Sequence, residues 1–374
     1  MPRCQPRPVR GTTDRMVSPD YKAAARRAAL VIFGLIALAV GLGWASHGAH
    51  SGRISISGRE ATVLFATLFL LTGLAGAGAI AAERLLFGWL RPSAALSPAR
   101  TRVAWIYLCL GLLELASCLW ARYVEPFRII KRQTTLALPG VRSRVRLVAF
   151  SDMHSDPRFD LDLRVAREVN ELHPDVIVFL GDSLNLAGRA PAFRQALTAM
   201  SARVAKLAIR GNWDIWYWDD IDLFSGTGFT EILSDWQTVA VDATVLRVGG
   251  HEWRDDFAPR SIVTAPPTGD GPAIFLYHAN DYIPAAAASG VDLYLCGDTH
   301  GGQVEIPGWG TIFAVGRQGL RFARGLYQVA RGRGQPGTMK AYVTPGLGVE
   351  GKVPFRFGVR PEITVLDLVP MGGS

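Results

Sequence analysis

The chain has 374 residues, 49% of them hydrophobic, so it is long enough for one large domain and a smaller second part. Its 40 Lys and Arg and 32 Asp and Glu are unevenly placed, because residues 1–143 carry a net charge of +12 and residues 144–374 carry −4. This distribution excludes a nucleic-acid groove on the larger part and fits a basic segment lying against anionic lipid headgroups. We therefore expect a lipid bilayer, and no nucleic acid, among the partners.

The first part of the chain contains three long apolar stretches. Residues 28–46 and 61–82 have no charged residue, and residues 103–121 have a single acidic one. Each stretch is close to the about 20 residues that an α-helix needs to cross a bilayer. The first has no obvious cleavage site for a signal peptide. The sequence predicts a basic tail over residues 1–27 and an anchor of three transmembrane helices over residues 28–122.

The basic residues around these stretches indicate an orientation. Seven Lys and Arg precede the first stretch, two separate the first from the second, and four separate the second from the third. By the positive-inside rule this favours a cytoplasmic N-terminus, so that three crossings leave the large domain outside the cytoplasm. Four residues after the third stretch argue the other way: Arg122, Arg128, Lys131 and Arg132. We expect a multi-pass protein of a bacterial inner (plasma) membrane with an extracytoplasmic domain.

From about residue 144 the pattern changes, after a stretch at 123–143 that we interpret as a linker. Short apolar runs such as VRLVAF and DVIVFL recur and stop at polar residues, with helix-like segments between them. Runs that are apolar on both faces are typical of strands covered on both sides. The sequence therefore predicts an α/β domain over residues 144–370, in which ligands collect at the carboxyl ends of strands.

Polar side chains follow five of these predicted strands. Carboxylates and imidazoles placed together at the edge of a core would be costly to desolvate without a cation. Mixed oxygen and nitrogen ligands suit Mn, Mg, Fe or Zn, and their number is about right for two ions that share a carboxylate. The expected ligands are Asp152, His154, Asp182, Asn212, His278, Asp298 and His300. His173 and His251 lack this position after a strand and are set aside.

The motifs SDMH, GDS, GNWD, YHAND and GDTHGGQ, in this order, resemble those of the calcineurin-like metallophosphoesterases. The similarity covers about residues 145 to 370. The late stretch GLGVEGKVPFRFGVRPEITVLDL and the EPFRI that follows the last apolar stretch are similar to the membrane-anchored bacterial branch. The resemblance implies a four-layer α/β/β/α sandwich and a hydrolase acting on phosphoric ester or anhydride bonds.

The resemblance also distributes the ligands between two divalent ions about 3.5–4 Å apart, which lower the pKa of a shared water. It implies that the first ion is held by Asp152, His154 and His300, and the second by Asn212, His278 and Asp298. Asp182 would bridge the two ions. A metal-bound hydroxide would attack phosphorus in line while the cations neutralise charge on the phosphoryl oxygens.

Three positions depart from the family pattern. The family usually has His where Asp298 stands, and the harder carboxylate predicts a shift toward Mg or Mn at the second site. It usually has a proton-donating His where Trp213 stands, and Trp cannot supply a proton in this way. It often has Asp where Asn185 stands. General acid catalysis is typically worth about 10² to 10⁴ in rate, so its loss favours a leaving group that is already a stable anion.

The missing acid favours cleavage of a phosphoanhydride. Some members of the wider superfamily cleave a UDP-linked diacylated sugar, which suits a membrane anchor, whereas an extracytoplasmic domain favours a lipid pyrophosphate or a phospholipid diester. We expect Trp213, Gly301 and Gly302 beside the substrate. The aromatic run WDIWYWDD either lines an apolar lip or packs against the core.

Three functions remain open at this stage. The first is a membrane-anchored phosphohydrolase with two metals, and the second is a catalytically weak or inactive metal-binding sensor domain on an anchor. The third is a transporter or channel, which is supported only by the three apolar stretches and the one acidic residue within them.

Overall fold

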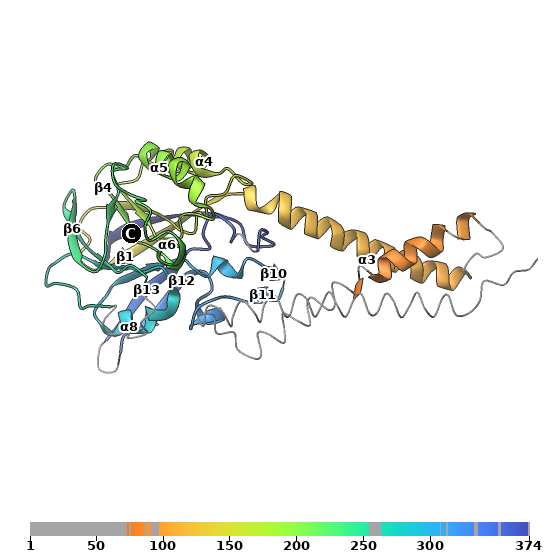
Figure 1. Cartoon of the computed structure of the whole chain (residues 1–374). Coiled ribbons are helices and arrows are strands. Elements are labelled where there is room, and N and C mark those ends of the chain that lie inside the picture. The colour runs from red at the N-terminus through yellow and green to blue at the C-terminus, as the bar shows by residue number, and fades with distance from the viewer. Residues whose placement is uncertain are drawn as a thin grey trace, which may run out of the picture.

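The computed structural model describes residues 73–74, 76–86, 88–90, 97–253, 263–306, 308–311, 313–332, 336–350 and 353–372. The predicted basic tail and the first apolar stretch lie outside the described residues, as does the second stretch up to residue 72. Figure 1 shows an α/β domain and a long helix, α3 (Pro98–Tyr123), that projects from one side of it.

Helix α3 is the most fully described part of the anchor. It begins at Pro98, a position where a missing backbone N–H leaves no hydrogen bond unmade. Most of its large apolar side chains are exposed, which fits contact with lipid. Among the described residues it is the one helix long and apolar enough to cross a membrane. Of the three predicted spans, the described residues therefore support only the one at 103–121.

The described residues 73–74, 76–86 and 88–90 are also helical and lie against α3. A Cβ atom added to Gly78 would be 3.1 Å from the Cα atom of Gly111, so the two backbones approach closely. Small residues at a crossing are typical of helices that pack within a membrane.

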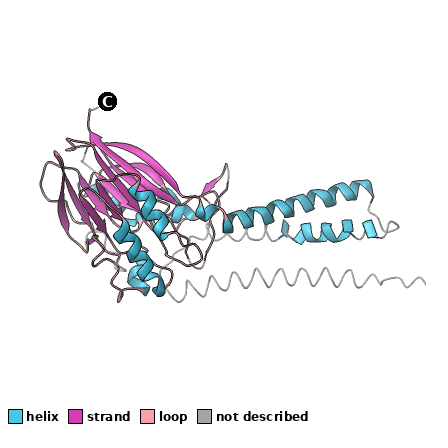
Figure 2. Cartoon of the chain, turned by 90° about the horizontal axis from the view of Figure 1, so that it is seen from above, coloured by secondary structure: helices cyan, strands magenta, loops and turns pink. Residues whose placement is uncertain are grey.

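Two six-stranded sheets form the centre of the domain (Figure 2). In the first sheet the strands lie in the order β1 (Ile130–Leu138), β14 (Glu362–Pro370), β2 (Val145–Phe150), β3 (Val176–Phe179), β4 (Ala205–Ala208) and β5 (Thr230–Glu231). In the second the order is β12 (Gly325–Ala330), β13 (Thr338–Val343), β9 (Leu293–Cys296), β8 (Ala273–Leu276), β7 (Thr244–Gly250) and β6 (Trp236–Val241). The strands β2 to β5 run parallel to one another, as do β7, β8, β9 and β13.

The layers follow from which face each strand residue buries. Alternate residues such as Leu147 and Ile274 meet in a core between the sheets. The opposite face of the first sheet packs against α4 (Asp162–Asn170) and α5 (Ala190–Ala199), and that of the second against α8 (Ile283–Ala288). Strands β3, β8 and β9 are buried along their whole length, which accounts for their continuous apolar sequences. The mixed α/β class expected from the sequence is confirmed.

Short elements complete the domain. They are α6 (Asn212–Tyr217), the hairpin of β10 (Glu305–Ile306) and β11 (Gly310–Thr311), and the 3₁₀ turns η2 (Glu125–Phe127), η3 (Ala187–Arg189), η4 (Asn280–Tyr282), η5 (His300–Gly302) and η6 (Gly319–Phe322).

The stretch 123–143 is not a linker, contrary to the prediction. It contains η2 and β1, and β1 pairs in parallel with β14 over its whole length. Strand β1 lies at the edge of the sheet, and its first residues are exposed or half-buried, so its sequence IKRQTTLAL is more polar than that of the central strands. The domain therefore starts directly where α3 ends.

Candidate metal centre

The polar residues predicted to follow strands do so in the structure. Asp152 and His154 follow β2, Asp182 follows β3, and Asn212 follows β4 as the first residue of α6. On the second sheet, His278 follows β8, while Asp298 and His300 follow β9. Because these strands end at the same edge of the two packed sheets, residues up to 148 positions apart meet at one place.

The loops that carry these side chains have an uncommon backbone. Five residues adopt the left-handed conformation, with φ of 51° at Asp152, 40° at His154, 59° at Asp182, 63° at Asp298 and 50° at His300. Residues other than glycine rarely adopt this conformation, and such outliers gather at functional sites where the surrounding structure holds them in place. The strain is therefore concentrated where the sequence predicts the ligands.

Asp152, His154 and His300 form one group of ligand atoms. The Nε2 atoms of His154 and His300 are 3.3 Å apart, and Nε2 of His300 is 3.3 Å from Oδ1 of Asp152. All the ligand atoms of this group lie within 4.8 Å of one another, and all three residues are buried. This is a spacing at which one cation can contact the three side chains.

Asp152, Asp182 and His278 form a second group. The Nε2 atom of His278 lies 3.3 Å from Oδ2 of Asp182 and 3.9 Å from Oδ1 of Asp152. The same nitrogen is 3.7 Å from Oδ1 of Asp298. Asp152 belongs to both groups, and Oδ2 of Asp182 is also 3.5 Å from Nε2 of His154. Two carboxylates therefore lie between the two groups.

The donor atoms of this centre fit divalent cations. Both carboxylate oxygens of Asp152, Nε2 of His278 and Oδ1 of Asn212 are buried and have no hydrogen-bond partner among the described residues. Burial raises the pKa of Asp152 to about 7 and that of Asp298 to about 8. Buried carboxylates without partners are costly, and bound cations would satisfy them. The residues and their chemistry support one or more divalent metal ions here.

The histidines are oriented toward the centre. Nδ1 of His278 is 2.7 Å from the carbonyl oxygen of Leu180, which fixes a proton on Nδ1 and directs Nε2 toward the centre, where a metal would replace the proton on Nε2. Burial lowers the pKa of His154 to about 4 and that of His300 well below its usual value. Burial acts against the charge of His278 as well, but the carboxylates of Asp182, Asp152 and Asp298 outweigh it and raise the pKa.

The position of Asp182 depends on Asp214, the last residue of the GNWD motif, which follows a predicted strand but was not among the expected ligands. The Asp214 carboxylate accepts hydrogen bonds from the backbone N–H groups of Asp182 and Ser183 at 2.8 and 2.9 Å. It also accepts one from Gly211 at 2.9 Å. A Cβ atom on Gly211 would be 2.2 Å from Oδ1 of Asp182, so only glycine fits beside that carboxylate.

Arg356 is a residue of the centre that the sequence did not point to. It is fully buried, and its guanidinium donates to the carbonyl oxygens of Pro345 and Gly348 at 2.9 Å. Its Nη2 atom is 3.4 Å from Nδ1 of His300, and its backbone N–H donates to the carbonyl oxygen of Ala121 in the last turn of α3 at 2.9 Å. The only sequence signal was its place in the late stretch that resembles the family.

The residues expected beside the substrate have different positions. Trp213 is half-buried, and its ring meets that of His154 edge-on with centroids 5.0 Å apart. A side chain on Gly301 would collide with Val359, and one on Gly302 with the carbonyl oxygen of Phe313. Close packing of protein therefore accounts for the two glycines, and their contact with a substrate stays a prediction.

The expectation that no strand precedes His251 is wrong. His251 directly follows β7 and is buried. Its Nδ1 atom is 2.8 Å from the carbonyl oxygen of Glu252, and it belongs to neither group of ligand atoms in the described part of the chain. A position after a strand is therefore not enough to make a histidine a ligand here.

The chain is similar to known phosphoesterases. Residues 145–302 match the calcineurin-like phosphoesterase family. The chain is 30% identical over 270 residues to the uncharacterized metallophosphoesterase YkuE of Bacillus subtilis. The aligned region covers 67% of this chain and 88% of that protein. It is 28% identical over 270 residues to phosphodiesterase YaeI of Escherichia coli, covering 67% of this chain and 92% of that protein.

A third relative is named as a transmembrane protein. The chain is 32% identical over 257 residues to a transmembrane protein with metallophosphoesterase domain from Danio rerio, covering 62% of this chain. The matched region spans 54% of that relative, so the chain corresponds to about half of its length.

Proposed function

The chain belongs to the calcineurin-like metallophosphoesterases, hydrolases that act on phosphoester bonds, and on this premise we propose a membrane-anchored phosphohydrolase that uses two divalent metal ions. The observation that carries the proposal is the pair of overlapping ligand groups, which have Asp152 in common and Asp182 between their histidines. One ion cannot contact all seven candidate side chains, whereas two ions sharing a carboxylate can.

The two groups support a division of the ligands. Asp152, His154 and His300 would hold one ion. His278, Asp298 and Asn212 would hold the other, and Asp182 would contact both. The ions could be Mn, Mg, Fe or Zn, and the carboxylate of Asp298 favours Mg or Mn on its side. Bound metal would supply positive charge for the phosphoryl oxygens and a water of lowered pKa as the nucleophile.

The protein's own residues fix the reacting groups in place. Asp214 holds the loop of Asp182, and the carbonyl of Leu180 fixes the ring of His278, so neither ligand has to reorganise when the substrate binds. Trp213 stands at the position where the family usually has a proton-donating histidine, and its ring lies against that of His154. With no acid at this position, the leaving group must depart as an anion, as in a phosphoanhydride or an activated diester.

A lipid-linked substrate is supported by the short path from the anchor to the centre. Arg356 contacts His300 through its side chain and Ala121 of α3 through its backbone. The centre therefore lies within a few side chains of the end of a helix that can span a membrane. The close approach of Gly78 to Gly111 supports at least one further helix in the anchor. We propose a multi-pass protein of a bacterial plasma membrane with its domain outside the cytoplasm, which favours a lipid pyrophosphate or phospholipid diester over a UDP-sugar.

The test is an activity screen with the purified full-length protein. With Mn or Mg it should hydrolyse bis(p-nitrophenyl) phosphate, and a lipid extract should contain a better substrate. A second candidate function, a metal-binding sensor domain without turnover, is favoured by Trp213 and Asp298, which replace the family's usual histidines. Bound metal together with no turnover under any divalent cation would support the sensor and contradict the hydrolase.

A further inference from the structure

The β10–β11 hairpin presents an unusual side chain to solvent. Trp309, in the turn between the two strands, is 87% exposed, more than any other large hydrophobic residue that the structure describes. A fully exposed tryptophan at the tip of a hairpin is unfavourable in water, and its ring is of the kind enriched where proteins meet the headgroup region of a bilayer. The Trp309 ring is therefore available for contact with something outside the domain.

Backbone hydrogen bonds tie this hairpin to the end of α3. The N–H of Glu305 donates to the carbonyl oxygen of Phe357 at 2.7 Å, and the N–H of Phe357 donates to that of Gln303 at 2.8 Å. The neighbouring Arg356 bonds in turn to Ala121 of α3. Figure 1 shows β10 and β11 on the side of the domain from which α3 projects. The hairpin and the exit of the helix thus lie on one face.

The end of α3 has the residues typical of a membrane boundary. Trp120 and Tyr123 are 41% and 63% exposed. The guanidinium of Arg122 lies over the ring of Tyr123, and that of Arg128 lies over the ring of Trp120. Phe355, next to Arg356, is a further exposed aromatic residue. Aromatic rings and arginines at the end of an apolar helix mark the level of the lipid headgroups.

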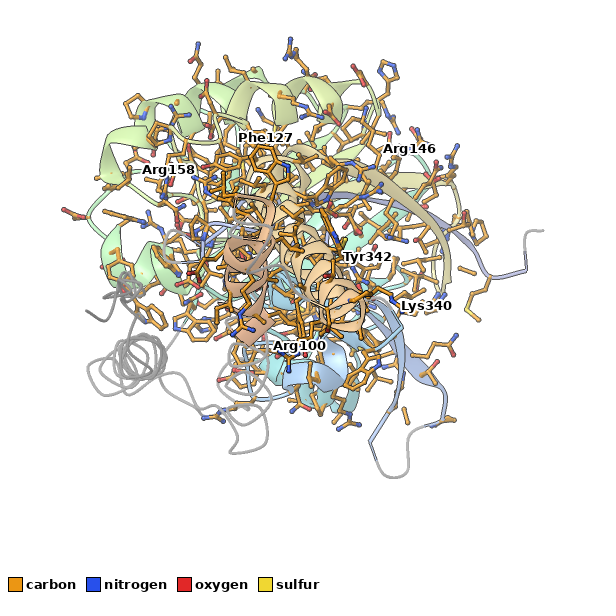
Figure 3. The ribbon with its side chains drawn as sticks, turned by 90° about the vertical axis from the view of Figure 1, so that its right-hand side faces the viewer. Arg100, Phe127, Arg146, Arg158, Lys340 and Tyr342 are labelled. Atoms are coloured by element: carbon orange, nitrogen blue, oxygen red, sulfur yellow. The ribbon has the colours of Figure 1, made fainter. Side chains whose placement is uncertain are left out.

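This face also has more cations than anions. Four arginines lie at or near the last turn of α3, in contact with Phe159, Trp120 or Glu125, namely Arg122, Arg128, Arg158 and Arg360. Among the described residues, Glu125 forms ion pairs with both Arg128 and Arg360, and Asp156 forms one with Arg158. Figure 3 looks onto this side of the domain, with Arg158 and Phe127 labelled near the helices. An excess of positive charge fits anionic headgroups.

We propose that the face made of Trp309, Phe355, Tyr123 and these arginines, the docking face, rests on the surface of the anionic bilayer that α3 enters, with Trp309 inserted among the headgroups. The proposal rests on the membrane anchoring proposed above and not on catalysis. The hairpin is joined to the metal centre, because the hydroxyl of Thr311 donates to the carbonyl oxygen of Gly301, the residue after His300, at 3.1 Å. Docking would hold the loop of His300 at the level of the headgroups.

The test uses the full-length protein in vesicles of phosphatidylglycerol and phosphatidylcholine, with or without brominated acyl chains that quench nearby tryptophan. The measured quantity is the loss of tryptophan fluorescence caused by the brominated lipid, and we expect this loss to be smaller in Trp309→Ser than in the wild-type protein. The matched control is Trp236→Phe, in β6 at the end of the domain away from α3 (Figure 1), which should leave the quenched emission unchanged. Equal quenched emission in the wild-type protein and Trp309→Ser would overturn the proposal.

Two further measurements distinguish lipid contact from protein contact and docking from catalysis. If Trp309 contacts a second copy or another protein, its emission will be shielded from brominated lipid and from aqueous acrylamide alike, and this too would overturn the proposal. Turnover of bis(p-nitrophenyl) phosphate in the same vesicles reports on the metal centre separately. Turnover without quenching at Trp309 would leave the hydrolase standing and remove the docking face, whereas quenching without turnover would do the reverse.

Discussion

The Nε2 atoms of His154 and His300 lie 3.3 Å apart, although the two residues come from different sheets and are 146 positions apart in the chain. Burial lowers the pKa of both rings, so both are neutral near pH 7. Two neutral imidazoles that present these nitrogens to one buried point, with the carboxylate of Asp152 beside them, have the arrangement of metal ligands.

Metal binding should release protons. At pH 7 the Asp298 carboxyl, with a pKa of about 8, and the His278 ring, with a raised pKa, are mostly protonated, and both must lose their protons to bind a cation. The Asp152 carboxyl, with a pKa of about 7, is partly protonated at the same pH. We therefore expect metal binding to release about two to three protons per protein, and the apparent metal affinity to rise with pH at least to about pH 8. Calorimetric titration of Mn into the metal-free protein, in buffers of different ionisation enthalpy, measures this. A binding enthalpy that does not depend on the buffer would contradict it.

Asp182→Asn should lose metal and activity together. The substitution removes the negative charge between His154 and His278 while keeping the size of the side chain, and we expect metal affinity to fall by more than about 100-fold. Metal content and turnover of a soluble diester are the measurements. Asp242→Asn, at an exposed residue paired with Arg203, is the control and should change neither. Full metal content in Asp182→Asn would show that Asp182 is not a bridge.

Trp213→His should restore a general acid. Because the Trp213 ring lies 5.0 Å from that of His154, a histidine there would sit beside the reacting phosphate, and we expect esters with poor leaving groups to be hydrolysed up to about 10²-fold faster. Rates for a series of leaving groups measure this, with Trp216→His, three residues along the same helix, as the control. A change confined to anhydride cleavage would show that our account of the missing acid is wrong.

Arg356→Lys should lower both the stability of the protein and its affinity for metal. Lysine keeps the charge but cannot donate to the carbonyl oxygens of Pro345 and Gly348 in the geometry of a guanidinium, and the loss should cost about 1–3 kcal/mol of stability. Because Arg356 also contacts His300, metal affinity should fall as well. Thermal unfolding and metal titration are the measurements. Arg360→Lys, at an exposed residue on the same segment, is the control, and loss of stability with unchanged metal affinity would limit Arg356 to a structural role.

The sequence was most informative for the central strands and for the residues directly after them. Runs such as DVIVFL are apolar because β3 is buried on both faces, so the strand and the turn to Asp182 could both be recognised. Parallel strands then bring their carboxyl ends to one edge without any knowledge of the turns between them. The geometry of each group could not be predicted, since the left-handed backbone at Asp152 and His300 depends on contacts between loops.

The residues that the sequence did not reveal act through contacts made only in the folded chain. Arg356 lies 56 positions from His300, and no local pattern links them. Strand β1 resembles a linker in sequence because an edge strand with polar, half-exposed residues has little apolar pattern. The sharing of Asp152 between the two groups was also not expected, because the resemblance pointed to Asp182 alone as the bridge.

The most direct test of the two-metal proposal is a crystal structure of the Mn-loaded protein with anomalous scattering data. We predict two anomalous peaks about 3.5–4 Å apart, one between Asp152, His154 and His300 and the other beside His278 and Asp298, with Asp182 in contact with both. A single peak, or none within reach of these side chains under saturating Mn, would contradict the proposal.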